Sequence, residues 1–335
     1  MALWLQRLAA TVLLVIGATV GALAQSFAPA LVYDLGGRFD KSFNEAAFTG
    51  AERFKAETGI AYREFEIRND TQREQALRTF AQRGQNPIIA VGFAFRAAME
   101  KVAGEFPNTR FVIIDATVDR PNVQNILFRE HEGSYLVGLL AAMKSQTGAI
   151  GFVGGMDIPL IRKFACGYVQ GARAGRADIR VIQNMTGTTG AAFSDPVRGG
   201  ELARSQIAQG ADVVYHAAGA TGIGVLQATA DSGKLGIGVD SNQNALHPGR
   251  VLTSMLKRVD VAIHAALVAG REGRWSSGTT VLGLAENGVD WADDEHNRPL
   301  ITPAMREAVV KAADDIRAGR LRVHDVMAAG DCPVR

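Results

Sequence analysis

The chain has 335 residues, enough for two domains of about 150 residues each, and a formal net charge of only +2. It contains no run of lysine and arginine and no basic stripe with interleaved aromatic residues, so the composition excludes a nucleic-acid-binding protein. With 47% hydrophobic and 21% charged residues, the composition is that of a globular protein and excludes a disordered one.

Residues 1–24 have the pattern of a secretory signal peptide. Arg7 is the only charged side chain, an apolar segment runs from Leu8 to Ala24, and Ala22-Leu23-Ala24 forms an A-x-A cleavage site. An uncleaved membrane anchor is the alternative, but the small residues of this segment weaken it. No later apolar run approaches the roughly 20 residues needed to span a bilayer. The sequence therefore predicts secretion, with no membrane insertion after signal cleavage.

The next apolar run, residues 30–35, predicts a buried strand that leads through a sharp loop into a helix. Gly36 and Gly37 permit the loop. Ser42 and Glu45 have the spacing of a capping box, in which each side chain satisfies a backbone N–H at the start of a helix.

Phe43 and Asn44 would then occupy the first exposed turn of that helix. This turn follows the carboxyl end of a strand, where open α/β sheets bind their ligands. An aromatic face beside an amide favours a flat, hydrogen-bonding ligand. The alternative is that Phe43 packs on a neighbouring loop and Asn44 is solvated.

Strand and helix patterns alternate from here to the end of the chain and form two similar series. The predicted strands are 30–35, 63–67, 87–91, 111–114, 123–128, 149–153, 180–183, 212–217, 235–239, 251–256 and 279–282. The predicted helices are 43–57, 71–83, 95–105, 133–144, 158–174, 196–209, 222–232, 259–271 and 302–317. Such alternation implies mostly parallel sheets with helices on both faces.

The predicted fold class is therefore α/β, with two Rossmann-like lobes. Two such lobes behind a signal peptide are typical of a type I periplasmic binding protein, whose lobes close on a ligand by hinge motion. We expect residues 28–129 with 257–278 to form the N-terminal lobe and residues 130–256 with 279–335 to form the C-terminal lobe. Crossing segments are expected near 128–132, 254–257 and 274–280.

Polar residues at the carboxyl ends of the predicted strands are the candidate ligand-binding residues. They are Asp34, Asp115, Gly219, Asp240 and Lys257. Residues in these positions face the cleft of an open α/β sheet. A single aspartate at a strand end is more often a helix cap, but several together with a lysine favour a binding site. The alternative for Asp240 and Lys257 is a salt bridge between the lobes.

Phe193 provides a second candidate aromatic ring. It precedes Asp195 and Pro196, which are suited to the cap and the first turn of a helix. Phe193 would then face Phe43 from the opposite lobe, and the two rings could hold a planar base between them. Core packing is the alternative.

A series of motifs along the chain is similar to the basic membrane protein (BMP) family of solute receptors. They are Asp34, Asp40-Lys41-Ser42-Phe43-Asn44, Gly50, Asn122 and the segments 92–95, 107–115, 128–138, 150–155, 210–212, 219–224, 237–240 and 252–258. The best-understood members of that family bind purine nucleosides for ABC transporters. The resemblance thus implies a purine nucleoside as ligand, an ABC transporter permease as partner and no cofactor.

The resemblance also implies roles for the candidate residues. Phe43 and Phe193 would stack on the base, and Asn44 and Asp115 would hydrogen-bond its edge. Asp240 and Lys257 would hold the ribose hydroxyls, Gly219 would allow close backbone approach, and Asp34 would line the pocket. The segment 288–298, which contains Trp291, departs from the family pattern, so Trp291 either edges the cleft or covers an apolar patch.

Many relatives carry a lipidated cysteine at the cleavage site, and this chain has none there. We therefore expect a free periplasmic protein. The two cysteines, Cys166 and Cys332, could pair in an oxidising compartment, but the sequence leaves this open.

Other functions remain as alternatives. Gly219-Ala220-Thr221-Gly222-Ile223-Gly224 superficially suggests a dinucleotide loop, but its spacing differs from G-x-G-x-x-G. No Walker loop, H-E-x-x-H or G-x-S-x-G motif is present, and the six histidines do not cluster as metal ligands, so we expect neither an enzyme nor a metal site. A receptor for a free nucleobase or another small polar ligand, or a sensory receptor with the same fold, stays open.

Overall fold

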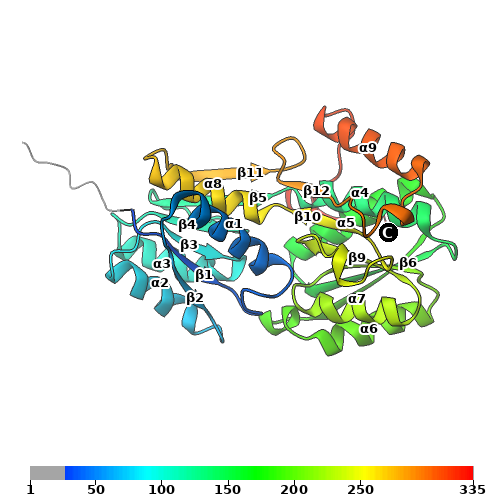
Figure 1. Ribbon diagram of the computed structural model, residues 1–335, viewed down its shortest axis with the longest axis horizontal. Helices are drawn as coiled ribbons and strands as arrows, with labels where there is room; N and C mark the ends of the chain where they lie inside the picture. Colours follow the sequence, from blue (N-terminus) through cyan, green and yellow to red (C-terminus); the bar gives the residue numbers. More distant parts are fainter. Residues whose placement is uncertain (1–26, 335) are drawn as a thin grey trace, which may run out of the picture.

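The computed structural model describes residues 27–334, which form two α/β lobes side by side (Figure 1). The predicted signal peptide lies outside the described residues. Each lobe contains one six-stranded sheet covered by helices. The predicted two-lobe α/β architecture is therefore confirmed. Within residues 27–334, no helix combines the length and apolar character required to cross a membrane.

The first sheet has the strand order β11-β5-β4-β3-β1-β2, and its neighbouring strands are parallel. The strands are β1 (Ala30–Tyr33), β2 (Arg63–Glu66), β3 (Ile88–Val91), β4 (Phe111–Ile114), β5 (Val123–Phe128) and β11 (Gly278–Leu282). The helices of this lobe are α1 (Phe43–Thr58), α2 (Gln72–Gln82), the 3-10 helix η1 (Phe93–Phe95), α3 (Arg96–Glu105) and α8 (Val259–Arg271). Every residue of β1, β3 and β4 is buried, as expected for parallel strands covered on both faces.

The second sheet repeats this arrangement in the order β12-β10-β9-β8-β6-β7. Its strands are β6 (Ala149–Met156), β7 (Arg180–Gly187), β8 (Val213–Ala217), β9 (Leu235–Asp240), β10 (Val251–Lys257) and β12 (Val289–Trp291). Its helices are α4 (Glu130–Lys144), α5 (Pro159–Gly175), η2 (Gly190–Phe193), α6 (Pro196–Ala208), α7 (Thr221–Asp231), η3 (Asn244–Leu246), η4 (Arg298–Leu300), α9 (Pro303–Arg317) and α10 (Val326–Ala329). The short β12, which was not predicted, is antiparallel to β10. Strand β9 thus occupies the same place in the second sheet as β4 does in the first.

The chain crosses between the sheets three times, after β5, after β10 and after β11. The first two crossings coincide with the predicted segments, but the third does not. Strand β11 pairs in parallel with β5 of the first sheet, although its residues were assigned to the second lobe. The third crossing therefore lies between Leu282 and Val289 and not at 274–280. A short edge strand carries no local signal of the sheet that it joins, because its partner is far away in the sequence.

The backbones of helices α4 and α5 approach each other unusually closely in the second lobe. A Cβ atom at Gly167 of α5 would overlap the backbone of His131, and one at Gly171 would overlap the backbone of Tyr135. On α4, Gly138 lies in the same way against Tyr168. Glycines at these positions therefore fix the contact between the two helices.

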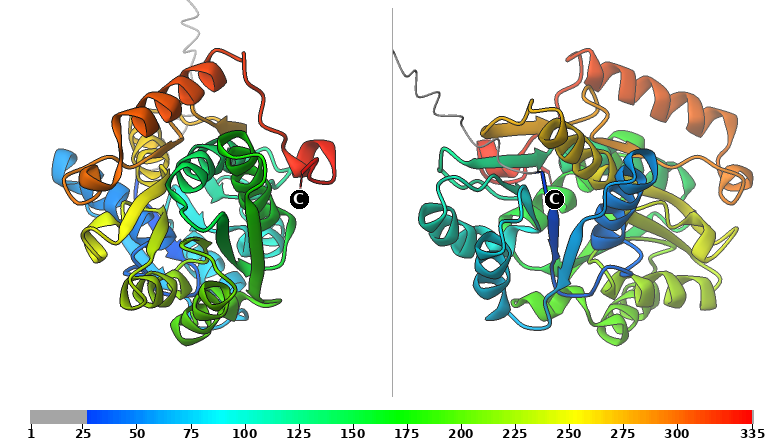
Figure 2. Two further views of the ribbon diagram at one scale, coloured as in Figure 1. Left: turned by 90° about the vertical axis from the view of Figure 1, so that its right-hand side faces the viewer. Right: turned by 60° about the vertical axis from the view of Figure 1, so that its left-hand side comes forward.

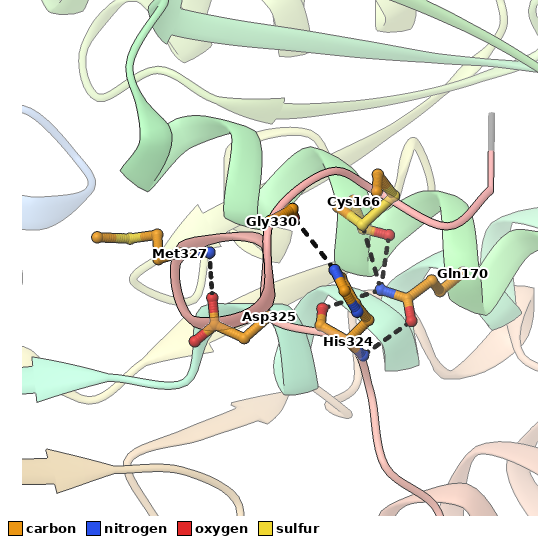
Figure 3. Close-up of a disulfide and its surroundings, with 7 residues drawn as sticks. Cys166, Gln170, His324, Asp325, Met327 and Gly330 are labelled. Carbon is orange, nitrogen blue, oxygen red and sulfur yellow. Dashed lines mark hydrogen bonds between the residues drawn. A yellow bond between two sulfur atoms is a disulfide. The ribbon is translucent and has the colours of Figure 1, made fainter.

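The C-terminal segment leaves α9 and returns to the outer side of α5 (Figure 2). A disulfide joins Cys332 to Cys166 of α5, with the two Cα atoms 5.7 Å apart. Beside it, the side-chain amide of Gln170 donates to the carbonyl of His324 at 3.1 Å and accepts from its N–H at 2.9 Å (Figure 3). The pairing that the sequence left open is therefore made in the structure.

Candidate functional site

A cavity of about 370 Å³ lies between the lobes, at the carboxyl ends of the central strands of both sheets. All eight candidate residues line it: Asp34, Phe43, Asn44, Asp115, Phe193, Gly219, Asp240 and Lys257. Parallel strands place their carboxyl ends at one edge of a sheet, and the two lobes turn these edges toward each other. The structure thus brings together residues that are more than 200 positions apart.

Asp115 and Asp240 occupy equivalent positions in the two lobes, Asp115 directly after β4 and Asp240 at the end of β9. Both have left-handed backbones, with φ of 68° and 63°. Such a conformation is costly for a residue other than glycine and recurs at binding sites, where the surrounding structure maintains it. Each lobe therefore places one of these two carboxylates in the cavity from an equivalent strand end.

Lys257 is the central cation of the cavity, and its side chain is 2% exposed. Its ammonium lies 2.6 Å from Asp115 Oδ2 and 3.0 Å from Glu130 Oε1. The rings of Phe43 and Phe128 each lie 5.1 Å from it. Burial acts to lower the pKa of Lys257, but these carboxylates raise it above its usual value, so the ammonium stays charged.

Asp240 was expected to act with Lys257, and its closest side-chain partner is instead Ser42. The Ser42 hydroxyl donates to Asp240 Oδ2 at 2.6 Å across the gap between the lobes. Burial raises the pKa of Asp240 to about 6, although Lys257 acts to lower it. The salt bridge between Asp240 and Lys257 that the sequence allowed is not made, because Lys257 is directed to Asp115 and Glu130.

Asp115 keeps one unused hydrogen-bond acceptor. Its Oδ1 atom is buried and has no hydrogen-bond partner among residues 27–334. Burial raises the pKa of Asp115 to about 6, against the opposing attraction of Lys257. A buried carboxylate oxygen without a donor is costly in a protein interior, so this atom is suited to accept a hydrogen bond from a bound molecule.

Four phenylalanine rings supply the aromatic part of the cavity: Phe43, Phe93, Phe164 and Phe193. Phe43 lies beside Lys257, whereas Phe193 packs edge-on against Phe93, with their ring centroids 6.3 Å apart. Phe193 also lies directly against Gly155 of β6, where a Cβ atom would overlap the ring. Phe93 was not predicted, although it follows β3 at the same sheet edge and could have been found by the rule that identified Asp115.

The start of α1 differs from the predicted capping box. Ser42 makes no side-chain capping bond, and the carboxylate of Asp40 accepts instead from the N–H groups of Ser42, Asn44 and Glu45, at 2.8, 3.0 and 3.1 Å. Asp40 thus satisfies three backbone donors at the start of the helix. The Ser42 hydroxyl is free to reach Asp240 for this reason.

Asn44 is 1% exposed and does not lie on an exposed turn as expected. Its side-chain amide donates to the carbonyls of Asp34 and Gly37, both at 3.2 Å, and its oxygen accepts from the N–H of Asp34 at 3.3 Å. Asn44 therefore holds the loop between β1 and α1, and only its oxygen retains capacity for a further bond.

Arg73 of α2 is a lining residue that the sequence did not reveal. Its guanidinium lies 2.6 Å from Asp34 and 2.7 Å from Asp70, which also line the cavity. Burial raises the pKa of Asp34 even though Arg73 acts to lower it. No strand-end rule points to a residue within a helix, so only the tertiary structure could place Arg73 here.

The glycines of the 219–224 motif serve packing. Gly219, with φ of 55°, lies against the backbone of Phe193, and a Cβ atom at Gly224 would overlap the carbonyl of Pro196 on α6. Gly222 in the same way leaves space for the ring of His216. Close packing around α7 explains the motif without a dinucleotide.

Two further expectations concern Trp291 and metal ligands. Trp291 does not line the cavity. The guanidinium carbon of Arg306 on α9 lies 5.9 Å from the centroid of its ring, so Trp291 packs against α9. Between residues 27 and 334, no group of three or more His, Cys, Asp or Glu side chains is arranged to hold a metal ion.

The lobes touch each other at one side of the cavity. Besides the bond from Ser42 to Asp240, the Ser241 hydroxyl donates to the carbonyl of Ser42 at 2.7 Å, and Gln243 donates to the carbonyl of Lys41 at 2.9 Å. All three bonds join the residues just before α1 to the end of β9 or to the segment that follows it. The structure is therefore in a closed arrangement of the two lobes.

Comparison with known proteins identifies similar chains. A family model described as "ABC transporter substrate-binding protein PnrA-like" matches residues 28–313. An uncharacterized lipoprotein of Pyrococcus abyssi is 36% identical over 281 residues, covering 79% of this chain and 68% of that protein. The ABC transporter nucleoside-binding protein BmpA of Lactococcus lactis is 31% identical over 328 residues, covering 91% of each. A solved solute-binding protein of an ABC transporter system from Aeropyrum pernix superposes with a TM-score of 0.83 at 29% identity, covering 90% of this chain and 94% of that one.

Proposed function

Because the chain belongs to the Bmp family of PnrA-like ABC transporter substrate-binding proteins, we propose that it captures a purine nucleoside between its lobes and delivers it to an ABC permease. Members of this family bind a solute and do not transform it, so the chain is not an enzyme. The type I periplasmic binding protein fold provides the two lobes between which the solute is enclosed.

The observation that carries the proposal is the combination of aromatic faces from both lobes with buried carboxylates in one cavity. Its volume, about 370 Å³, lies in the usual range of small-molecule sites, roughly 300–1,000 Å³. Phe43 and Phe193 would stack on the base, and Asp115 Oδ1 would accept a hydrogen bond from its edge. Asp240 and Lys257 would hold the ribose. The printed name of the Lactococcus relative, a nucleoside-binding protein, supports this ligand class.

A free nucleobase is the second candidate ligand, because Lys257 already has two carboxylate partners in the structure. In that case Lys257 would serve to hold Asp115 and would not meet a ribose hydroxyl. A sensory receptor with the same site would bind the same ligands. Only its membrane partner would distinguish it from a transport receptor.

We also propose that the protein acts outside the cytoplasm, as a free periplasmic receptor. Three similar proteins from Pyrococcus species are named lipoproteins, so anchoring by a lipid is the competing arrangement. Cell fractionation separates the two: recovery in the osmotic-shock fluid supports the free form, and recovery with the membranes contradicts it.

The test of the ligand is a thermal-shift screen with purine nucleosides, their free bases, pyrimidine nucleosides, NAD and sugars. A ligand at about 100 times its dissociation constant stabilises a protein by roughly 2.7 kcal/mol, which a melting curve resolves. We expect stabilisation by purine nucleosides. A response to free bases alone would select the second candidate, and a response only to sugars or NAD would overturn the ligand assignment.

A further inference from the structure

A chain of alternating charges leads from the ligand cavity into the protein interior. Asp115 contacts Lys257, Lys257 contacts Glu130, and Glu130 Oε2 lies 2.8 Å from the ammonium of Lys163. Of these four residues, only Asp115 and Lys257 line the cavity. Glu130 is 0% exposed and Lys163 is 7% exposed, and neither residue lines the cavity, so neither contacts a molecule bound there.

The fold brings these residues together at the first crossing between the lobes. Glu130 is the first residue of α4, two positions after the end of β5, where the partial positive charge of a helix N-terminus also favours a carboxylate. Gly167 packs against His131, and Lys163 lies one helical turn before Gly167 on the same side of α5. Lys163 therefore reaches Glu130, and its ammonium also donates to the carbonyl of Phe128 at 2.7 Å.

Lys163 and Lys257 approach Glu130 from different elements. Oε1 of Glu130 faces Lys257 and Oε2 faces Lys163. Removal of Lys163 would leave Lys257 as the single cation between the buried carboxylates of Asp115 and Glu130, and removal of Lys257 would leave Asp115 without its cation. The carboxylate of Glu130 consequently fixes the place of Lys257 with respect to the first crossing segment.

We propose that Glu130 and Lys163 are positioning residues of the binding site, which hold the ammonium of Lys257 where it meets Asp115 and the bound molecule. The inference rests on the proposed function for the identity of the ligand, but the arrangement of the four charges is independent of it. Lys257 ends β10 at the second crossing, so the same contacts join the first two crossing segments of the closed protein.

The first experiment needs no ligand. The groups facing Asp115 are Lys257 on β10, Glu130 on α4 and Asp240 on β9, and both Glu130 and Asp240 act to raise its pKa. In Glu130→Gln one of these negative charges is lost and Lys257 is no longer shared. We expect the pKa of Asp115 to fall, as measured by NMR titration of isotope-labelled aspartate carboxyl groups and assigned with Asp115→Asn. An unchanged Asp115 titration would overturn the proposal.

The second experiment measures dissociation constants for adenosine, guanosine and inosine by calorimetry. Glu130→Gln and Lys163→Met should each weaken binding by at least about tenfold, because a partner of a buried charge pair is lost. Lys163→Arg, which keeps the cation, should retain most of the affinity. Glu132→Gln is the matched control, because Glu132 lies on the same turn of α4 and accepts from Leu284 without contacting Lys257.

The outcomes separate the two proposals. If the wild-type protein binds none of the nucleosides, the proposed function fails, and the Asp115 titration still decides the role of Glu130. If nucleosides bind and Glu130→Gln and Lys163→Met bind as the wild type does, the positioning role fails. If Glu130→Gln does not fold, Lys163→Met provides the same decision.

Discussion

At the scale of single residues, the two aromatic side chains proposed to hold the base are Phe43 and Phe193. Stacking of a base on an aromatic ring contributes about 1–3 kcal/mol as measured by alanine substitution. Phe43→Ala and Phe193→Ala should each weaken nucleoside binding by that amount in isothermal calorimetry. Unchanged affinity in both variants would remove the stacked base from the proposal.

Asp240 should distinguish a nucleoside from its free base. Asp240→Ala removes an acceptor for the ribose hydroxyls, at a cost of about 1.5–3 kcal/mol for hydrogen bonds to a charged group. Because this variant also loses the bond from Ser42 that joins the lobes, both ligands should bind more weakly, and the nucleoside should lose this additional affinity relative to its base. Equal losses for both ligands would contradict a ribose contact.

The raised pKa of Asp240 also predicts a pH dependence of binding. Hydroxyl groups donate to the ionised carboxylate, and below a pKa of about 6 a proton occupies the group instead. Affinity should therefore fall as the pH is lowered from neutral through about 6. Asp115, with its pKa also raised to about 6, should contribute in the same direction. In Asp240→Asn the decline should be shallower, and an identical decline would exclude Asp240 as its source.

At the scale of secondary-structure elements, β6 provides the space for Phe193 through Gly155. A Cβ atom at this position would overlap the ring, so Gly155→Ala should displace Phe193 and weaken nucleoside binding by about 1–3 kcal/mol, the value of a lost stacking contact. Gly187→Ala on the neighbouring β7 is the control, because its Cβ atom would meet Ala192 at an ordinary 3.5 Å. Calorimetry on the two variants should separate them.

The disulfide attaches the C-terminal segment to α5 and should stabilise the fold. Native disulfides typically contribute about 2–4 kcal/mol, and this one joins residues 166 positions apart. A reductant should lower the midpoint of denaturant unfolding, and the Cys166→Ala, Cys332→Ala double variant should start from the lower value without responding to reductant. Equal midpoints for oxidised and reduced wild type would show that the bond adds nothing to stability.

At the scale of the whole molecule, Ser42 joins the two lobes through its bond to Asp240. Ser42→Ala should favour the open arrangement and weaken nucleoside binding by about 1.5–3 kcal/mol, the usual value of a hydrogen bond to a charged group. At one ligand concentration below saturation, small-angle scattering should show a larger fraction of open protein than in the wild type. Thr49→Ala is the control, since Thr49 bonds only within α1 at an exposed position. Unaltered scattering and affinity in Ser42→Ala would contradict this role.

The two-sheet architecture and the cavity-lining aspartates could be predicted because their signals are local. Strand and helix periods are visible in short windows, and Asp115 and Asp240 were found because each follows an apolar strand. The same rule could have identified Phe93. The capping of α1 was predicted wrongly, since Ser42 and Asp40 are equally suitable caps by composition, and only the presence of Asp240 opposite Ser42 distinguishes them.

Which side chains meet in the cavity depended on contacts between distant segments. Lys257 and Asp115 are 142 residues apart, and Ser42 and Asp240 are 198 apart, so no sequence window contains both members of either pair. The strand that β11 joins, β5, is also far from it in the sequence, and Cys166 is 166 positions from Cys332. Periodicity determines which residues reach the edge of a sheet, because it follows from backbone geometry. Which side chains meet in the cavity depends on how the two lobes pack and close. The free energy of that packing is distributed over contacts throughout the folded chain.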